Sequence, residues 1–283
     1  MGHRARHRRV FDGPDESVGT RCLRGPHCTI GVRADTLTDT HQTNAWREET
    51  VGRDRALVRK GEEVTMTFAL GPATGAAKEP DRLTAILDNR VLRLRHCEQI
   101  HGGTIHELSA GGQEVVDVGP GDGLITSSPG VGLLVWTADC VPVLLAADGV
   151  VAAVHSGWRG CAVDIVGAAI DRMTRHYEIS RKRIGAALGP AVCGSCYEVG
   201  PEVPEALRRF DLDESRWLAD NHVDLRGFLN ARLEALGLPA ENIETIGGCT
   251  AETPELASFR RDGESAGRQW AMAYLNHRKA LSY

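Results

Sequence analysis

A carboxylate, a thiol and an imidazole stand at the ends of the two most apolar runs of this 283-residue sequence. Asp139 and Cys140 directly precede the run Val141–Ala147. His155 directly follows the run Val150–Val154. The short turn "ADG" between the runs predicts an antiparallel hairpin. Because neighbouring strands lie about 4.8 Å apart, such a hairpin brings Cys140 and His155 together at its open end.

A thiol beside an imidazole supports two kinds of chemistry. In the first, His155 lowers the pKa of the Cys140 thiol, which then acts as a nucleophile in acyl transfer. In the second, both side chains bind a metal, and a third ligand comes from elsewhere, because a catalytic zinc site uses three protein ligands and keeps one position open. The segment "HCEQIHGGTIHE" offers His101, or its neighbours His96 and His106, as that ligand.

The elements around these residues indicate a fold of the α+β class. Strands are predicted at "EVTMTFAL", "EVVDV", "RIGAALGP", "NIETIGGCT" and "GRQWAMAYL", and helices at Glu79–Leu94, Cys161–His176, Pro204–Phe210 and Asp224–Leu236. The helical segments carry apolar residues at helical spacing. Since strands and helices mix without strict alternation, we expect one mixed α/β domain in which helices and sheet form layers.

Residues 1–63 are mostly polar and show little apolar periodicity. We expect them to be a disordered extension or the product of an over-extended reading frame, with the folded domain spanning 64–283. No apolar segment follows the basic start "MGHRARHRRV", and no apolar run approaches the roughly 20 residues that cross a membrane. A cytoplasmic protein without membrane contact is the expectation.

The charge and the cysteine content argue against a nucleic-acid-binding protein and against a fold stabilised by disulfides. The formal net charge of -5 argues against a general affinity for nucleic acid. The eight cysteines are too widely spread for a disulfide framework. The pair Cys193 and Cys196 in "CGSC" has the spacing of a redox pair or of half a structural zinc site. No second half is evident in the sequence, which favours structural thiols.

Five motifs, in the same order as in a known family, carry a specific resemblance. They are "QIHG", "TADC", "HSGWRG", "YEVG" and "SFRRDGESAGR". Between about Leu94 and Leu275 the chain resembles the YfiH-like proteins, also called laccase-domain, multicopper polyphenol oxidase-like or purine nucleoside phosphorylase-like proteins. The resemblance implies the layered fold of that family and a Zn²⁺ ion bound by His101, Cys140 and His155.

The resemblance also implies a reaction. Family members are regarded as purine nucleoside enzymes that cleave adenosine, inosine, guanosine or methylthioadenosine with phosphate, and some deaminate adenosine. Arg159 lies in a glycine-bounded turn before a predicted helix and would orient phosphate. Arg260 and Arg268 are further candidates for binding phosphate. Asp139 would act as a base or, in the commoner arrangement, would hold a ligand histidine.

Other functions compete with this one. A cysteine hydrolase using Cys140 and His155 is the alternative, since some family members carry the designation peptidoglycan editing factor. A catalytically inactive binding protein is a third possibility. Copper is the weaker metal assignment, because the sequence has neither the H-x-H pairs nor the Cys-His step of a blue-copper oxidase. The sequence leaves the oligomeric state open.

Overall fold

The computed structural model describes residues 45–52, 54–71 and 93–277. Its strands are β1 (Arg47–Val51), β2 (Asp54–Lys60), β3 (Val64–Ala69), β4 (Arg93–Glu98), β5 (Ile105–Leu108), β6 (Val115–Pro120), β7 (Gly123–Thr126), β8 (Val131–Thr137), β9 (Val141–Ala147), β10 (Val150–Ser156), β11 (Gly185–Leu188), β12 (Leu218–Ala219), β13 (His222–Val223), β14 (Ile243–Thr245) and β15 (Gln269–Leu275). Its α-helices are α2 (Trp158–Ala162), α3 (Ile165–Arg175), α4 (Glu202–Arg208), α5 (Leu225–Ala235) and α6 (Phe259–Asp262).

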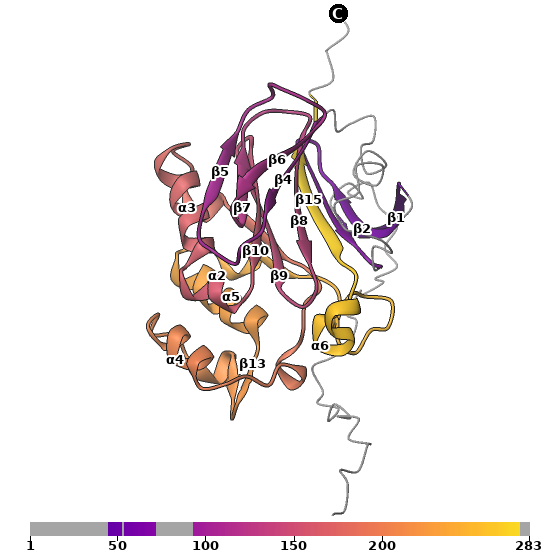
Figure 1. The fold of residues 1–283 in the computed structure, drawn as a ribbon. Coiled ribbons are helices and arrows are strands. Elements are labelled where there is room, and N and C mark those ends of the chain that lie inside the picture. Colours follow the sequence, from indigo (N-terminus) through magenta and orange to yellow (C-terminus); the bar gives the residue numbers. More distant parts are fainter. Residues whose placement is uncertain (1–44, 53, 72–92, 278–283) are drawn as a thin grey trace, which may run out of the picture.

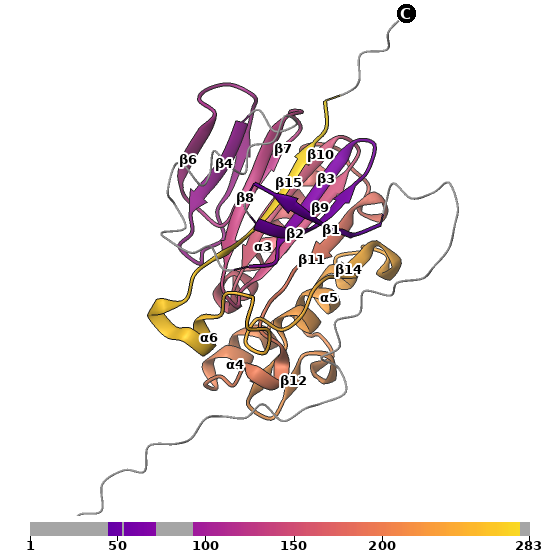
Figure 2. The ribbon, with the colours of Figure 1, turned by 90° about the vertical axis from the view of Figure 1, so that its right-hand side faces the viewer.

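Two large sheets and a layer of helices make up the fold. Within the described residues, one sheet has seven strands in the order β1-β2-β3-β15-β8-β4-β6, and the other has six in the order β14-β11-β9-β10-β7-β5. The sheets pack against each other, and α3 and α5 cover the outer face of the six-stranded sheet (Figure 1). Figure 2 shows the strands of the seven-stranded sheet side by side, in a view turned by 90° about the vertical axis. The prediction of a layered α+β fold is confirmed.

The central hairpin is buried on both faces. In β9, Val143 and Leu145 pack with the helices, whereas Leu144 packs between the two sheets. The same alternation holds along β10, where Ala152 faces the helices and Ala153 the other sheet. A strand enclosed on both sides needs apolar residues at every position. This burial explains the two continuous apolar runs from which the hairpin was predicted.

The register of the hairpin places the candidate site at its open end. β9 and β10 are antiparallel, with His155 opposite Pro142 and Ser156 opposite Val141. The turn between them has positive φ at Asp148 (47°) and Gly149 (75°), as a two-residue hairpin turn requires. One step beyond the last pair, Cys140 comes to face Gly157. The predicted hairpin is confirmed.

The helix predicted over Cys161–His176 is two helices in the structure. The chain breaks at Asp164, which adopts the left-handed conformation with φ 61° and ψ 45°. The Asp164 carboxylate forms an ion pair with Arg232 of α5, at 2.6 Å between Oδ2 and Nη2. A Cβ on Gly167 would lie 2.1 Å from Asp164 Oδ2, so glycine makes room for this carboxylate. The ion pair and the glycine explain a break that apolar spacing does not reveal.

The structure corrects the expected start of the folded part at residue 64. Strand β1 pairs with β2, and β2 pairs with β3, so residues 47–51 and 54–60 belong to the seven-stranded sheet. Ala56 and Leu57 of β2 are buried despite their charged neighbours. Residues 1–44 of the predicted extension lie outside the described residues, as does the expected helix from Glu79 up to residue 92.

The helix predicted over Asp224–Leu236 is confirmed in detail. The Asp224 side chain accepts a hydrogen bond from the backbone N–H of Arg226 and caps α5. Gly237 follows the helix with φ 94°, the left-handed conformation that ends many helices. Among the described residues, no helix is long and apolar enough to cross a membrane.

Candidate metal centre and its cavity

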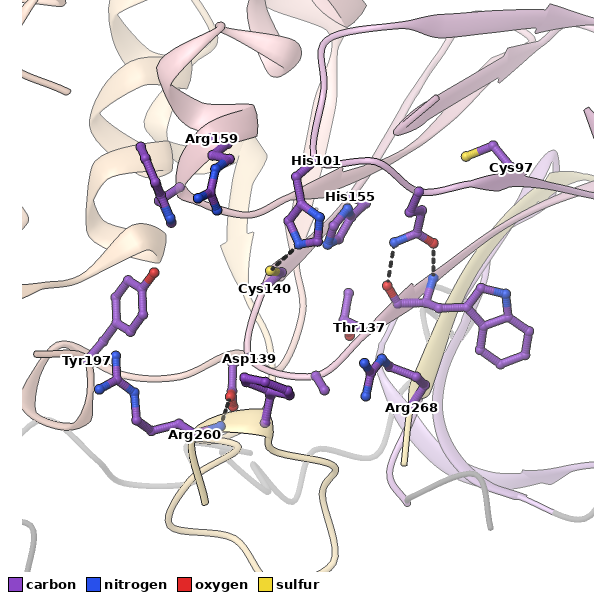
Figure 3. A pocket seen from close by; sticks show the side chains of 15 residues that line it. Cys97, His101, Thr137, Asp139, Cys140, His155, Arg159, Tyr197, Arg260 and Arg268 are labelled. Carbon is purple, nitrogen blue, oxygen red and sulfur yellow. Dashed lines mark hydrogen bonds between the residues drawn. The ribbon is translucent and has the colours of Figure 1, made fainter. Parts of the chain in front are cut away.

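Three side chains from three separate segments meet at the open end of the hairpin. His101, Cys140 and His155 each offer a ligand atom, and these atoms lie within 4.8 Å of one another. Cys140 Sγ is 3.9 Å from His101 Nε2, and the two imidazole rings have centroids 4.8 Å apart (Figure 3). The predicted set therefore comes together in space. Its role as a ligand set stays a prediction.

The other two histidines of "HCEQIHGGTIHE" lie outside this cluster. His96 is buried in β4, with its Nδ1 3.7 Å from a carboxylate oxygen of Asp117. His106 Nε2 is hydrogen-bonded to the carbonyl of Pro120 at 2.9 Å. Of the three histidines that the sequence offered, His101 is the one beside Cys140.

Gln99 fixes the loop that carries His101. Its side-chain Nε2 donates to the Trp136 carbonyl at 2.7 Å, and its Oε1 accepts from the Trp136 N–H at 2.8 Å. Gln99 lies just beyond the end of β4, and its amide thus bonds both backbone groups of Trp136 in β8. His101 follows with φ 59°, a conformation that is uncommon outside glycine. Such backbone strain persists where surrounding contacts hold it, often at functional sites.

Asp122 connects the loop of His101 with the imidazole of His155. This fully buried carboxylate accepts hydrogen bonds from the backbone N–H groups of Ile100, His101 and Gly102, at 3.2, 3.0 and 2.6 Å. It also binds Nδ1 of His155 at 2.8 Å. The sequence analysis missed Asp122, since "GPGDG" reads as a turn. The signal available there was an acidic residue directly before a buried strand.

The contact with Asp122 determines which ring nitrogen of His155 carries the proton. A carboxylate at Nδ1 keeps a proton on that nitrogen and leaves the lone pair of Nε2 available, the arrangement common among metal-binding histidines. Burial works to raise the pKa of Asp122, but its hydrogen bonds to His155 and Gly102 outweigh burial and lower it. Asp122 is therefore the charged carboxylate that this role requires.

The thiol and the imidazole shift each other's proton affinity. Burial acts to raise the pKa of Cys140, but the nearby His155 and His101 lower it to about 6. Burial acts to lower the pKa of His155, but Cys140 and Asp122 raise it to about 9. The site thus favours a thiolate, which is the form of cysteine that binds metals and acts as a nucleophile.

Gly157 leaves room for the cluster. A Cβ at this position would lie 2.8 Å from Cys140 Sγ and 3.2 Å from His101 Cδ2. Since real side chains do not approach so closely, glycine allows sulfur and imidazole to meet here. The first glycine of "HSGWRG" thus has a steric explanation.

The donor set fits zinc. Zn–S and Zn–N bonds of about 2.3 and 2.0–2.1 Å place tetrahedral ligand atoms about 3.3–3.6 Å apart. The observed 3.9 Å between Cys140 Sγ and His101 Nε2 needs only a small contraction. Two imidazoles and one thiolate also match the three protein ligands of catalytic zinc sites.

The cluster opens into a cavity of about 740 Å³, which lies within the range of about 300–1,000 Å³ typical of small-molecule sites. Its walls carry aromatic rings and guanidinium groups. These belong to Trp136, Trp158, Tyr197, Phe259, Arg159, Arg260 and Arg268. All three arginines predicted to bind phosphate therefore line the same cavity as His101, Cys140 and His155 (Figure 3).

Two of these arginines stack on aromatic rings. The Arg159 guanidinium lies 4.4 Å from the ring centroid of Trp158, and that of Arg260 lies 5.1 Å from Tyr197. Stacking leaves the edges of a guanidinium able to donate hydrogen bonds. Arg268 donates to the carbonyls of Ala266 and Gly267.

The structure corrects the role expected for Asp139 as the partner of a ligand histidine. Its Oδ1 accepts a hydrogen bond from Thr250 Oγ1, and its Oδ2 accepts one from the backbone N–H of Arg260, both at 2.6 Å. With φ 81°, Asp139 stands in the left-handed region. The Asp139 carboxylate therefore holds the start of α6, and the carboxylate that contacts His155 is Asp122.

The sequence of the chain is similar to a known family and to proteins of named activity. The family model described as "Multi-copper polyphenol oxidoreductase laccase" matches residues 73–276. The chain is 35% identical over 210 residues to a purine nucleoside phosphorylase of Deinococcus radiodurans, covering 72% of this chain and 78% of that protein. It is 38% identical over 162 residues to adenosine deaminase RL5 of an unknown prokaryotic organism, covering 54% and 62% of the two chains.

Solved structures share the fold. The hypothetical protein YfiH of Bacillus licheniformis superposes with a TM-score of 0.72 at 23% identity, covering 82% of this chain and 99% of that one. YlmD of Geobacillus stearothermophilus does so with a TM-score of 0.66 at 25% identity, covering 83% and 100%. On the family match and these relatives, the chain belongs to the YfiH-like family, whose model is described as multi-copper polyphenol oxidoreductase laccase.

Proposed function

We propose that this protein is a zinc-dependent purine nucleoside phosphorylase. The proposal is carried by the cluster of His101, Cys140 and His155 in a cavity whose walls combine aromatic rings with three arginines. The names of the relatives, purine nucleoside phosphorylase and adenosine deaminase, support purine nucleosides as the substrate class. Their agreement with the chemistry of the cavity is what favours this function over a general binding role.

The side chains that line the cavity would bind different parts of the reacting system. His101, Cys140 and His155 would hold the zinc ion, which supplies a Lewis acid at this end of the cavity. The aromatic rings of Trp158 and Tyr197 would stack on the purine, because stacking is favourable for any flat aromatic ring.

Phosphate would be bound by the arginines. Arg159, Arg260 and Arg268 carry positive charge on the same cavity wall, and guanidinium groups bind phosphate oxygens with two parallel hydrogen bonds. A phosphate oxygen would then form the new bond to C1′ of the ribose while the bond from C1′ to the purine nitrogen breaks. The products are ribose 1-phosphate and the free base, which takes up a proton.

Adenosine deamination is a second candidate activity, favoured by the relative named adenosine deaminase. In this reaction water replaces the amino group at C6 of adenine and ammonia leaves. A cysteine hydrolase remains the alternative, because the cluster favours the Cys140 thiolate. The sulfur of Cys140 has His101 and His155 beside it, and the carboxylate of Asp122 binds His155. This arrangement matches a metal site better than a nucleophilic cysteine activated by a single base.

A nucleoside panel with and without phosphate tests the proposal. The full chain, with its metal content measured, should release free base from inosine, guanosine, adenosine or methylthioadenosine only when phosphate is present. One zinc per chain is expected at the cluster of His101, Cys140 and His155, and His101→Ala should abolish both this zinc and turnover. His106→Ala, which removes a histidine outside the cluster, serves as the matched control. A folded protein that turns over no nucleoside, or that does so equally with His101→Ala, would refute the proposal.

A further inference from the structure

A second cluster of potential ligands lies apart from the first. Cys193, Cys196, Cys249 and Glu252 each offer a ligand atom, and these atoms lie within 4.8 Å of one another. Cys193 directly precedes a short 3₁₀ turn, Gly194–Cys196, and Cys196 is its last residue. The sequence showed no partner for this pair, but the fold brings Cys249 to it from 56 residues further along.

Backbone contacts hold the two segments together. Ala191 and Cys249 form a parallel β-bridge, and the Thr250 N–H donates to the Ala191 carbonyl at 3.1 Å. The Cys193 N–H donates to Cys249 Sγ at 3.3 Å. Hydrogen bonds from backbone N–H groups to sulfur are a regular feature of metal–thiolate sites, where they stabilise the negative charge on sulfur.

The burial of the cluster suits a bound ion. Cys193 and Cys249 are buried, Cys196 is half-buried and Glu252 is exposed. The protein therefore encloses the sulfur side, while the carboxylate side remains open to solvent and offers an entry path. Three sulfurs and one carboxylate supply all four positions of a tetrahedral zinc site, which is the pattern of structural sites rather than catalytic ones.

We propose that Cys193, Cys196, Cys249 and Glu252 form a second, structural metal site for a zinc-like divalent cation in the reduced protein. Cys196 is disulfide-bonded in the structure, so the site is complete only after this bond is reduced. Because Cys193 and Cys249 are free cysteines, the disulfide partner of Cys196 lies outside the cluster. An external dithiol supplies the two electrons and two protons that return Cys196 and this partner as thiols, and is itself oxidised to a disulfide. Each cysteine then releases a proton on binding the metal.

The site would support the walls of the first cavity. Cys196 directly precedes Tyr197, whose ring lines the cavity (Figure 3). Cys249 directly precedes Thr250, whose hydroxyl donates to Asp139 at 2.6 Å. A metal joining these two segments would fix both walls relative to each other. It would therefore position cavity residues without touching substrate.

Cobalt binding to the full chain tests the proposal separately from turnover. The Cys140→Ser variant removes the sulfur of the first site, so that sulfur-to-cobalt charge-transfer absorption reports the second cluster alone. After reduction with a dithiol, removal of the dithiol and treatment with a chelator, this variant should bind one Co²⁺ with strong charge-transfer absorption. Before reduction the affinity should be at least tenfold weaker.

Further substitutions in the Cys140→Ser background assign the ligands. Cys249→Ser should weaken Co²⁺ binding at least tenfold, and Glu252→Gln, at an exposed position, should weaken it by a smaller factor. Cys161→Ser removes a buried cysteine outside the cluster and should leave the absorption unchanged. If Cys249→Ser does not fold, Cys196→Ser gives the same readout. Absence of the absorption in the reduced, folded protein, or its survival in Cys249→Ser or Cys196→Ser, would overturn the proposal.

Discussion

Replacing Asp122 with asparagine should impair metal binding at the first site, although Asp122 is not itself a proposed ligand. The substitution preserves the size of the side chain and removes its charge. The carboxylate accepts four hydrogen bonds, three from backbone N–H groups and one from the His155 imidazole. An asparagine oxygen has two lone pairs, so about half of these donors would face the amide NH₂ instead.

The expected magnitude follows from these contacts. If the imidazole of His155 accepts from the new NH₂ group, its proton moves to Nε2 and that nitrogen can no longer bind a metal. Loss of a carboxylate partner at a ligand histidine typically costs 10–100-fold in metal affinity, which is about 1.4–2.7 kcal/mol. Each buried N–H left without an acceptor destabilises the fold by about 1–3 kcal/mol. We therefore expect weaker metal binding together with a lower melting temperature.

A chelator competition assay measures the affinity, and circular dichroism checks the fold. Asp117→Asn is the matched control, because Asp117 also lies beside a histidine, at 3.7 Å from His96, but away from the cluster. The control should retain the metal affinity of the unmodified chain. If folded Asp122→Asn binds zinc as tightly as the control, the assignment of Asp122 as the residue that positions His155 is wrong.

Three further predictions concern the same site. Gly157→Ala places a Cβ 2.8 Å from Cys140 Sγ and should weaken metal binding at least tenfold, as measured by competition, and normal affinity would contradict the steric argument. In metal-free protein, alkylation of Cys140 should rise with pH around a pKa of about 6, since the thiolate forms above that value, and a midpoint near 8.5 would contradict the lowered pKa. Arg159→Gln should raise the KM for phosphate without changing the zinc content, and an unchanged KM would exclude this arginine from the phosphate site.

Local sequence patterns predicted the hairpin that carries half of the candidate site. The apolar runs of β9 and β10 and the turn between them fix a register that depends only on neighbouring residues. Contact between Cys140 and His155 follows from that register. Asp224 and Gly237 at the ends of α5 could likewise be read from the sequence, because capping depends on residues within one turn of the helix.

Other features depend on contacts between distant segments. Asp122 binds the His101 loop and His155 only because β7 pairs with β10. Cys249 meets Cys193, which lies 56 residues away along the chain, because Ala191 and Cys249 form a β-bridge. Apolar periodicity reports which face of an element is buried but not which distant polar group lies against it. The sequence by itself therefore determined the hairpin and its thiol and imidazole, and the tertiary structure decided which carboxylate orients that imidazole and which sulfurs gather in the second cluster.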